Sequence, residues 1–150
     1  MLPASAIVAV GADTATPAPG VLDALAEADV VLLPPSNPVV SIGTILQVKG
    51  IREALVDRPV VGLSPIVGGN PVRGMADACL SAIGVQTSAE AVGRHYGARS
   101  DGGLLDAWLV DTADAGASVP GVEVRAVPLL MHDLDATTAM ARAALELAGA

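Results

Sequence analysis

Short apolar runs alternate with segments of helical spacing along most of the chain. The apolar runs are typical of buried β-strands, and they span residues 4–10, 30–33, 60–63, 85–87, 107–110 and 122–127. Helices are predicted between them, over residues 21–28, 41–46, 50–57, 75–83, 88–96 and 133–148. Because strands and helices alternate, the pattern predicts an α/β fold with a mostly parallel sheet and helices on both faces.

Single residues mark several boundaries of these elements. Ser41 and Ser88 stand where N-caps of the following helices are expected, and Gly84 stands where a helix C-terminus needs a residue with positive φ. The apolar setting of Trp108 and Cys79 predicts that both side chains lie in the core, with the Trp108 N–H paired.

A polar loop follows the predicted strand 30–33. Its sequence, PPSNPVVS over residues 34–41, cannot continue a central strand, because prolines lack the N–H that a ladder needs. In open α/β sheets ligands bind outside the carboxyl ends of the strands, so Ser36, Asn37 and Ser41 are candidates for hydrogen bonds to a ligand. A rigid turn that satisfies neighbouring backbone groups explains the same residues, and the pattern leaves both readings open.

A second loop, SPIVGGNPVRG over residues 64–74, follows the strand 60–63 and precedes a predicted helix. Gly68 and Gly69 can adopt positive φ and bring backbone N–H groups close to a ligand, and Arg73 is the cation of the loop. A glycine-rich turn at a helix N-terminus is a phosphate cradle in many proteins. An ordinary tight turn explains the glycines equally well, since the loop matches no standard phosphate-binding motif.

The chain is acidic and poor in aromatic residues. Its formal net charge is −8 and 1% of its residues are aromatic. The charge argues against broad electrostatic binding to nucleic acid or to anionic membranes. Tyr96 and Trp108 are too few to build a stacking platform for single-stranded nucleic acid.

The hydrophobic share is high, at 52%, yet every stretch of roughly 18 residues contains proline, glycine or charge. We therefore expect no membrane-spanning helix. Residues 1–10 lack the basic region of a signal peptide, and the single cysteine excludes an internal disulfide. Both observations fit a cytoplasmic location.

The other residues that could bind a metal do not form a clear ligand cluster in the sequence. His95 and His132 have no carboxylate at a metal-ligand spacing, so packing or surface roles are expected for both. Asp111 and Asp114 follow a predicted strand, where a metal site and a solvated loop are both compatible with the sequence. No metal ligand is assigned within the chain.

Four stretches resemble the 2-phospho-L-lactate transferase family of coenzyme F420 biosynthesis, and in particular its actinobacterial phosphoenolpyruvyl transferases. They are LPPSNPVVSIGTIL, VVGLSPIVGGNPVRGMADACL, SAEAVGRHYGARSDGGLLDAWLVD and VRAVPLLMHDLDATTAMARAALELAG. The resemblance runs from about residue 4 to the C-terminus. It implies that residues 1–150 are the C-terminal half of a Rossmann-like, CofD-like transferase domain whose N-terminal half is absent here.

The resemblance also implies a reaction. A phosphate-linked enolpyruvyl or lactyl group passes from a guanosine diphosphate-linked donor to the deazaflavin Fo, and GMP is released. Mg²⁺ is the implied cofactor, with its ligands in the absent half, and a homodimer is implied for the full-length protein. The chain alone is then expected to be inactive or weakly active.

Site residues follow from the same resemblance. Arg73 is the candidate catalytic residue, because its charge would neutralise phosphate oxygens. The candidate nucleotide- and phosphate-binding residues are Ser36, Asn37, Ser41, Ser64, Pro65, Gly68, Gly69 and Gly74.

Two other interpretations compete with the transferase. The first is a non-catalytic, CofD-like regulatory protein that binds a nucleotide sugar. Proteins of that group typically have a first loop similar to GPGSLYTS and a second loop similar to MTQ. This chain has PPSNPVVS and SPIVGG at these places, which favours the transferase. The second is a structural fragment that self-associates through exposed apolar edges.

Overall fold

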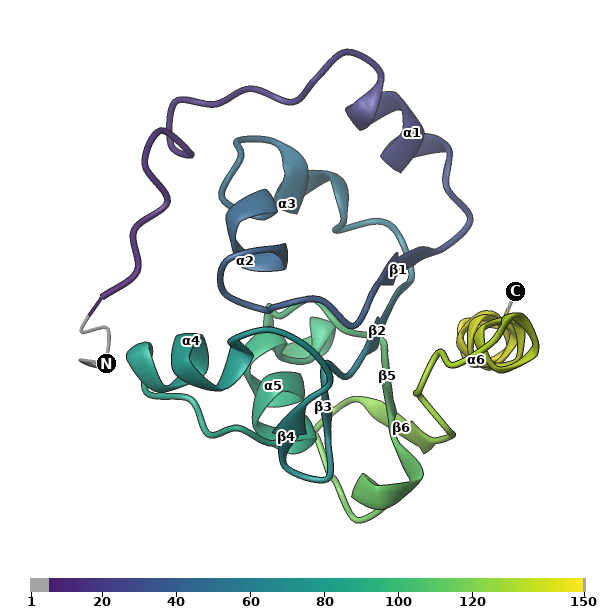
Figure 1. The fold of residues 1–150 in the computed structure, drawn as a ribbon. Coiled ribbons are helices and arrows are strands. Elements are labelled where there is room, and N and C mark those ends of the chain that lie inside the picture. Colours follow the sequence, from purple (N-terminus) through teal and green to yellow (C-terminus); the bar gives the residue numbers. More distant parts are fainter. Residues whose placement is uncertain (1–5, 150) are drawn as a thin grey trace.

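The computed structural model describes residues 6–149. Its centre is a four-stranded, fully parallel sheet in the order β1-β2-β5-β6 (Figure 1). The strands are β1 (Val31–Leu33), β2 (Val60–Leu63), β5 (Ala107–Val110) and β6 (Glu123–Ala126). All four predicted runs from which they form are confirmed, and β6 lies at an edge of the sheet.

Helices cover both faces of this sheet, as the α/β prediction requires. They are α1 (Val21–Glu27), α2 (Ile42–Ile45), α3 (Ile51–Ala54), α4 (Ala76–Ala82), α5 (Ala89–Tyr96) and α6 (Leu134–Leu147), with 3₁₀ turns η1 (Arg99–Asp101) and η2 (Thr112–Asp114). One core joins Val60 and Trp108 to α4 and α5, and the other joins Val61 and Leu109 to α6. In Figure 1, α6 stands on the opposite side of the sheet from α4 and α5.

Helix caps explain which predicted boundaries are correct. The Ser88 Oγ accepts from the Ala91 N–H at 3.1 Å, so its predicted N-cap role is confirmed. Gly84 has a φ of 73° after α4, and the Val85 N–H donates back to the Leu80 carbonyl at 2.9 Å. The predicted strand over residues 85–87 is therefore wrong, because the helix C-cap uses the Val85 N–H.

The predicted strand over residues 4–10 is also wrong where the structure describes it. Residues 4 and 5 lie outside the described range, and residues 6–10 form no strand. The Val8 and Val10 residues are 77% and 95% exposed. An apolar sequence of this kind becomes a strand only when a neighbour accepts its backbone hydrogen bonds, and residues 6–149 place no strand beside it.

Trp108 is the largest fully buried side chain of the described core. Its Nε1–H donates to the Ala89 carbonyl at 3.0 Å, which confirms the predicted pairing and ties β5 to the start of α5. Two glycines leave the space for the indole. A Cβ at Gly62 would lie 2.6 Å from ring carbons of Trp108, and a Cβ at Gly93 would lie 2.9 Å from the Trp108 Nε1.

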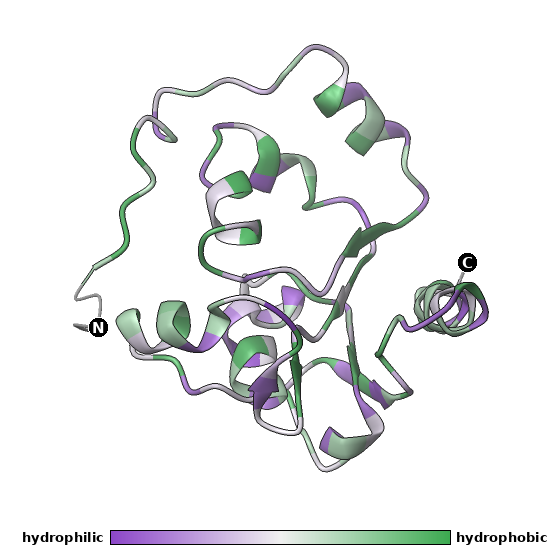
Figure 2. Ribbon diagram, viewed as in Figure 1, coloured by the Kyte–Doolittle hydropathy of each residue, from purple (hydrophilic) through white to green (hydrophobic). Residues whose placement is uncertain are grey.

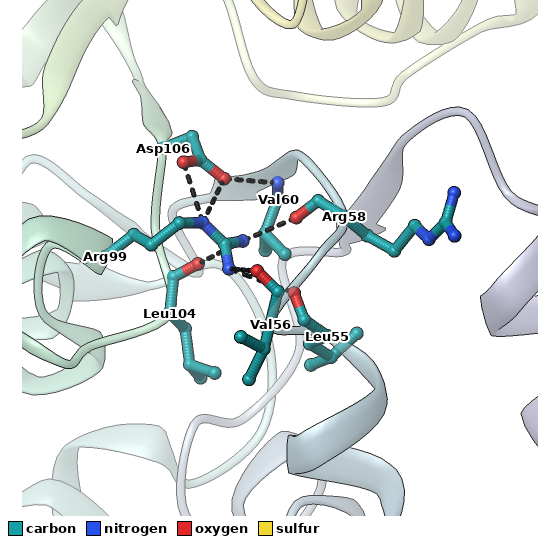
Figure 3. A network of polar contacts seen from close by, with 7 residues as sticks. All are labelled: Leu55, Val56, Arg58, Val60, Arg99, Leu104 and Asp106. Atoms are coloured by element: carbon teal, nitrogen blue, oxygen red, sulfur yellow. Dashed lines mark hydrogen bonds and ion pairs between the residues drawn. The ribbon is translucent and has the colours of Figure 1, made fainter.

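Arg99 links several segments at the end of the sheet where β2 and β5 begin (Figure 3). Its guanidinium donates to four backbone carbonyls, those of Leu55, Val56, Arg58 and Leu104. Its Nε donates to Asp106, whose Oδ2 also accepts from the Val60 N–H at 2.7 Å. The segment 97–103 thus contains η1 and joins the end of α3 to β2 and β5.

We predict that Gly62→Ala destabilises the fold. The new methyl group meets the rigid indole of Trp108, and overpacking of a core costs about 1–3 kcal/mol. For a chain of this size the loss corresponds to a fall in Tm of roughly 3–10 °C. Thermal unfolding followed by circular dichroism measures the change.

Gly116→Ala is the matched control, because a Cβ at Gly116 meets nothing within 4 Å. Its Tm should stay within about 1–2 °C of the parent chain. Equal Tm values for the two variants would show that Trp108 does not require a glycine at position 62.

Candidate functional site

The two predicted loops leave neighbouring strands at the same edge of the sheet. β1 pairs with β2 in parallel, with Leu33 opposite Gly62. The loop over residues 34–41 follows β1, and Ser64 follows β2 directly. Asp111 follows β5, the next strand along. The carboxyl ends of three adjacent strands therefore present polar residues together, which is the position where α/β sheets bind ligands.

In the first loop, two backbone N–H groups donate hydrogen bonds to the side-chain oxygen of Asn37. Its Oδ1 accepts from the N–H groups of Val39 at 2.9 Å and Val40 at 3.1 Å. The Asn37 carbonyl also accepts from the Ser41 N–H at 3.2 Å. The rigid-turn reading of Asn37 is thus present in the structure, while its side-chain NH₂ makes no hydrogen bond to the described residues.

Ser41 stands at the N-cap position of α2 without making a cap hydrogen bond. The predicted N-cap position is therefore correct, but the Ser41 hydroxyl does not make the capping hydrogen bond. The Asn37 side chain and carbonyl accept N–H groups of residues 39–42, just before and at the start of α2. Ser36 and Ser41 are both half-buried. The structure keeps Ser36, Asn37 and Ser41 within one turn, and their contacts to a ligand remain a prediction.

The second loop is a β-hairpin. The strands β3 (Ile66–Val67) and β4 (Asn70–Pro71) pair antiparallel, with Gly68 at φ 55° and Gly69 at φ 78° between them. Two consecutive positive φ values are typical of a type I′ hairpin turn, which other residues adopt poorly. The glycines therefore do not lead directly into a helix, since α4 begins at Ala76.

One N–H group of this turn already donates a hydrogen bond to a carboxylate. The Gly68 N–H donates to the Asp114 Oδ2 at 2.9 Å, and Asp114 comes from η2 after β5. This contact holds the hairpin against the loop that follows β5. A phosphate that used the Gly68 N–H would have to displace the Asp114 carboxylate.

Ser64 and Pro65 form the buried base of the hairpin. Ser64 is 0% exposed, and its hydroxyl donates to the Ile66 carbonyl at 2.8 Å and accepts from the Ile66 N–H at 3.1 Å. The Pro65 carbonyl accepts from the Val72 N–H at 3.0 Å. In this arrangement both residues shape the loop, and neither is open to a ligand.

Arg73 and Gly74 lie between the hairpin and α4, and both are exposed. Gly74 has a φ of 79°, so it reverses the chain just after Arg73. Among residues 6–149, Arg73 has no ion-pair partner. Of the predicted site residues, Arg73 is thus the one whose charge is available to an anion.

Asp111 has a structural role that the sequence left open. Its Oδ1 accepts from the Ala113 N–H at 3.0 Å, and its Oδ2 accepts from the Leu129 N–H at 2.9 Å. Burial alone would raise the pKa of Asp111, but these hydrogen bonds and the Thr112 hydroxyl outweigh it and hold the pKa below its usual value. The ionised carboxylate therefore stabilises the fold at neutral pH and loses that effect as the pH falls through the acid range.

The part of the chain that the structure describes does not fit a magnesium site. It contains no group of three or more His, Cys, Asp or Glu side chains placed to hold a metal ion. Mg²⁺ needs an octahedron of oxygen ligands, whereas both Asp111 oxygens accept backbone N–H groups. No metal-dependent step is assigned to these residues.

A hollow of about 330 Å³ lies apart from the glycine hairpin. Arg52, His95 and Tyr96 line it together with apolar residues of the segments near α2. Burial, followed by the charge of Arg52, lowers the pKa of His95 below its usual value, which favours the neutral imidazole. Neither the hairpin glycines nor Arg73 line the hollow, whereas Pro38 and Val39 of the first loop do.

The helices of the described residues are all too short or too polar to cross a bilayer.

Comparison with known proteins addresses the whole chain. The family model described as 2-phospho-L-lactate transferase CofD matches residues 2–145. A protein named phosphoenolpyruvate transferase from Streptomyces griseus is 65% identical over 97% of this chain and 46% of its own length. Proteins of the same name from Thermobifida fusca and Mycobacterium sp. (strain JLS) are 64% and 60% identical, over 44% and 45% of their lengths.

The chain thus spans less than half the length of the curated relatives it matches. The family match nevertheless covers almost all of its residues, including both loops at the carboxyl edge of the sheet. The chain belongs to the 2-phospho-L-lactate transferase CofD family.

Proposed function

We propose that the chain is the C-terminal half of a phosphoenolpyruvate transferase of coenzyme F420 biosynthesis. The full protein would move an enolpyruvyl-phosphate or phospholactyl group from a guanosine diphosphate-linked donor to the deazaflavin Fo and release GMP. The observation that carries the proposal is the identity of 64–65% to proteins named phosphoenolpyruvate transferase, which extends over at least 97% of the chain.

Residues at the carboxyl ends of the strands support a role for this chain in binding the phosphate groups of the donor. Phosphoryl transfer depends mainly on positioning and on stabilising charge at phosphate oxygens. Arg73 supplies an exposed guanidinium that can bind two phosphate oxygens. Gly69 is exposed in the hairpin turn and allows a close approach of a ligand to the backbone.

The first loop supports the same site from β1. Asn37 keeps its side-chain NH₂ available, and the loop follows the strand beside β2. In the proposal Asn37 and its serine neighbours orient the nucleotide or the three-carbon group. Ser64 and Pro65 contribute by fixing the base of the hairpin, since both are buried.

Other parts of the reaction need residues beyond this chain. Tyr96 and Trp108 are buried in the core, so neither can stack on the Fo ring. The described residues also offer no magnesium site. We therefore place the Fo site and the metal ligands in the part of the relatives that the chain does not match.

We predict that the chain alone releases GMP at least roughly 100-fold more slowly than a complete domain, because it lacks groups that position the acceptor. The complete domain is a chimaera: the Thermobifida fusca protein with this chain in place of its matching segment. Both proteins would be incubated with Fo, guanylylated donor and Mg²⁺. The amount of GMP released is the readout.

The unmodified Thermobifida fusca protein is the positive control for the assay. Rapid GMP release by the chain alone would disprove the half-domain proposal. A folded chimaera that forms no product with either the enolpyruvyl or the lactyl donor would disprove the transferase assignment.

We predict that Arg73→Ala in the chimaera lowers kcat/KM for the donor by roughly 10- to 150-fold, the equivalent of one charge-assisted hydrogen bond of about 1.5–3 kcal/mol. Arg73→Lys keeps the charge but loses the planar fork, so an intermediate loss is expected. Steady-state kinetics with varied donor concentration measure both variants.

Arg142→Ala is the matched control, because Arg142 is an exposed arginine on α6, across the sheet from α4 and α5. Its kcat/KM should stay within about twofold of the parent chimaera. If Arg73→Ala and Arg142→Ala behave alike, Arg73 does not contact the donor.

A further inference from the structure

We propose that the free edge of β1 is an interface for one more parallel strand. The strand would come from the part of the longer relatives that this chain does not match. The proposal concerns how the sheet continues, and it requires the family relationship but not the proposed reaction.

The two edges of the sheet differ in their chemistry. β6 carries Glu123 and Arg125, and the Arg125 Nη2 lies 3.9 Å from the Glu123 Oε1. Charged side chains of this kind protect an edge strand from further pairing. β1 reads Val31-Leu32-Leu33, without a charge, a proline or a bulge. An uninterrupted apolar sequence is typical of an interior strand in a parallel sheet. Figure 2 shows β1 as hydrophobic as β2 and β5.

The backbone of β1 has hydrogen-bonding groups to spare. The Val31 N–H donates to the Pro59 carbonyl at 2.8 Å, so the backbone of Val31 faces β2. Alternate residues of a parallel strand face opposite neighbours, and the N–H and C=O of Leu32 therefore point away from β2. Among residues 6–149, β1 has β2 as its single strand neighbour.

Both cores are incomplete at β1. Val31 and Leu32 face opposite sides of the sheet and are half-buried, whereas their partners Val60 and Val61 are fully buried. A strand beside β1 would cover Val31 on one face and Leu32 on the other. Burying such side chains is worth about 25 cal/mol for each Å² of apolar surface.

The topology points in the same direction. From β1 to β6 each new strand is added on the same side of the sheet. Doubly wound sheets reverse this direction once, at the point where ligands bind. No reversal occurs within the described strands, so further strands of the domain belong beyond β1.

Two other occupants fit the structure less well. Residues 6–10 of this chain have the right composition, but Ile7 lines the hollow that contains His95, against α2 and α5. A second copy related by a two-fold axis would pair β1 antiparallel with itself. The relatives, by contrast, have more than half of their length outside the match, which leaves room for parallel strands and their crossover helices.

Hydrogen exchange at single amides tests the interface. In the chimaera we expect the Leu32 N–H to exchange on the order of 100-fold more slowly than in the chain alone, and about as slowly as Val61. The Val124 N–H is the internal control. The Val127 N–H donates to the Val110 carbonyl, so Val124 faces away from β5 at the opposite edge and should exchange rapidly in both proteins.

Rapid exchange at Leu32 in the folded chimaera would overturn the proposal. Slow exchange at Leu32 in the chain alone would overturn it in two ways. If the protection grows with protein concentration, a second copy occupies the edge. If the protection disappears when residues 1–10 are deleted, the chain's own N-terminal segment occupies it.

Discussion

The packing of Trp108 sets how closely α5 can approach the sheet, and the indole is the largest side chain of the core on that face. The indole requires glycine at two positions far apart in the sequence, Gly62 on β2 and Gly93 on α5. Its N–H fixes the first residue of α5 through the Ala89 carbonyl. β2 and β5 pair in parallel beside one another, so the loops that follow them meet, and the Gly68 N–H reaches Asp114.

The N-terminal and C-terminal ends of the strands differ in how their polar groups are used. At the end where strands begin, Arg99 satisfies carbonyls at the end of α3 and ties them to Asp106, which makes a firm base. At the end where strands finish, buried Ser64 and Asp111 shape the turns, and Arg73 stays exposed without an ion-pair partner among the described residues. A rigid frame thus presents a few free groups at one edge, and in our account these groups are half of a nucleotide cleft.

Features encoded by local pattern could be predicted from the sequence, and features that depend on distant partners could not. The strands β2 and β5 and the Ser88 cap follow from neighbouring residues. The apolar setting of Trp108 predicts that its N–H is paired, but it does not identify the partner, the Ala89 carbonyl, which lies far away in the sequence. The strand expected over residues 4–10 failed because residues 6–149 offer it no partner. The Arg99 network and the Asp114 contact were missed because they join segments about 40 or more residues apart.

We propose that the carboxyl ends of these strands bind a guanine nucleotide only as part of a complete cleft. Isothermal titration of GDP into the chain alone and into the chimaera measures whether this is so. Our account predicts that the chimaera binds GDP at least roughly tenfold more tightly, a difference of about 1.4 kcal/mol. Equal affinity of the two proteins would contradict the account, because this chain would then contain the whole nucleotide site or contribute nothing to it.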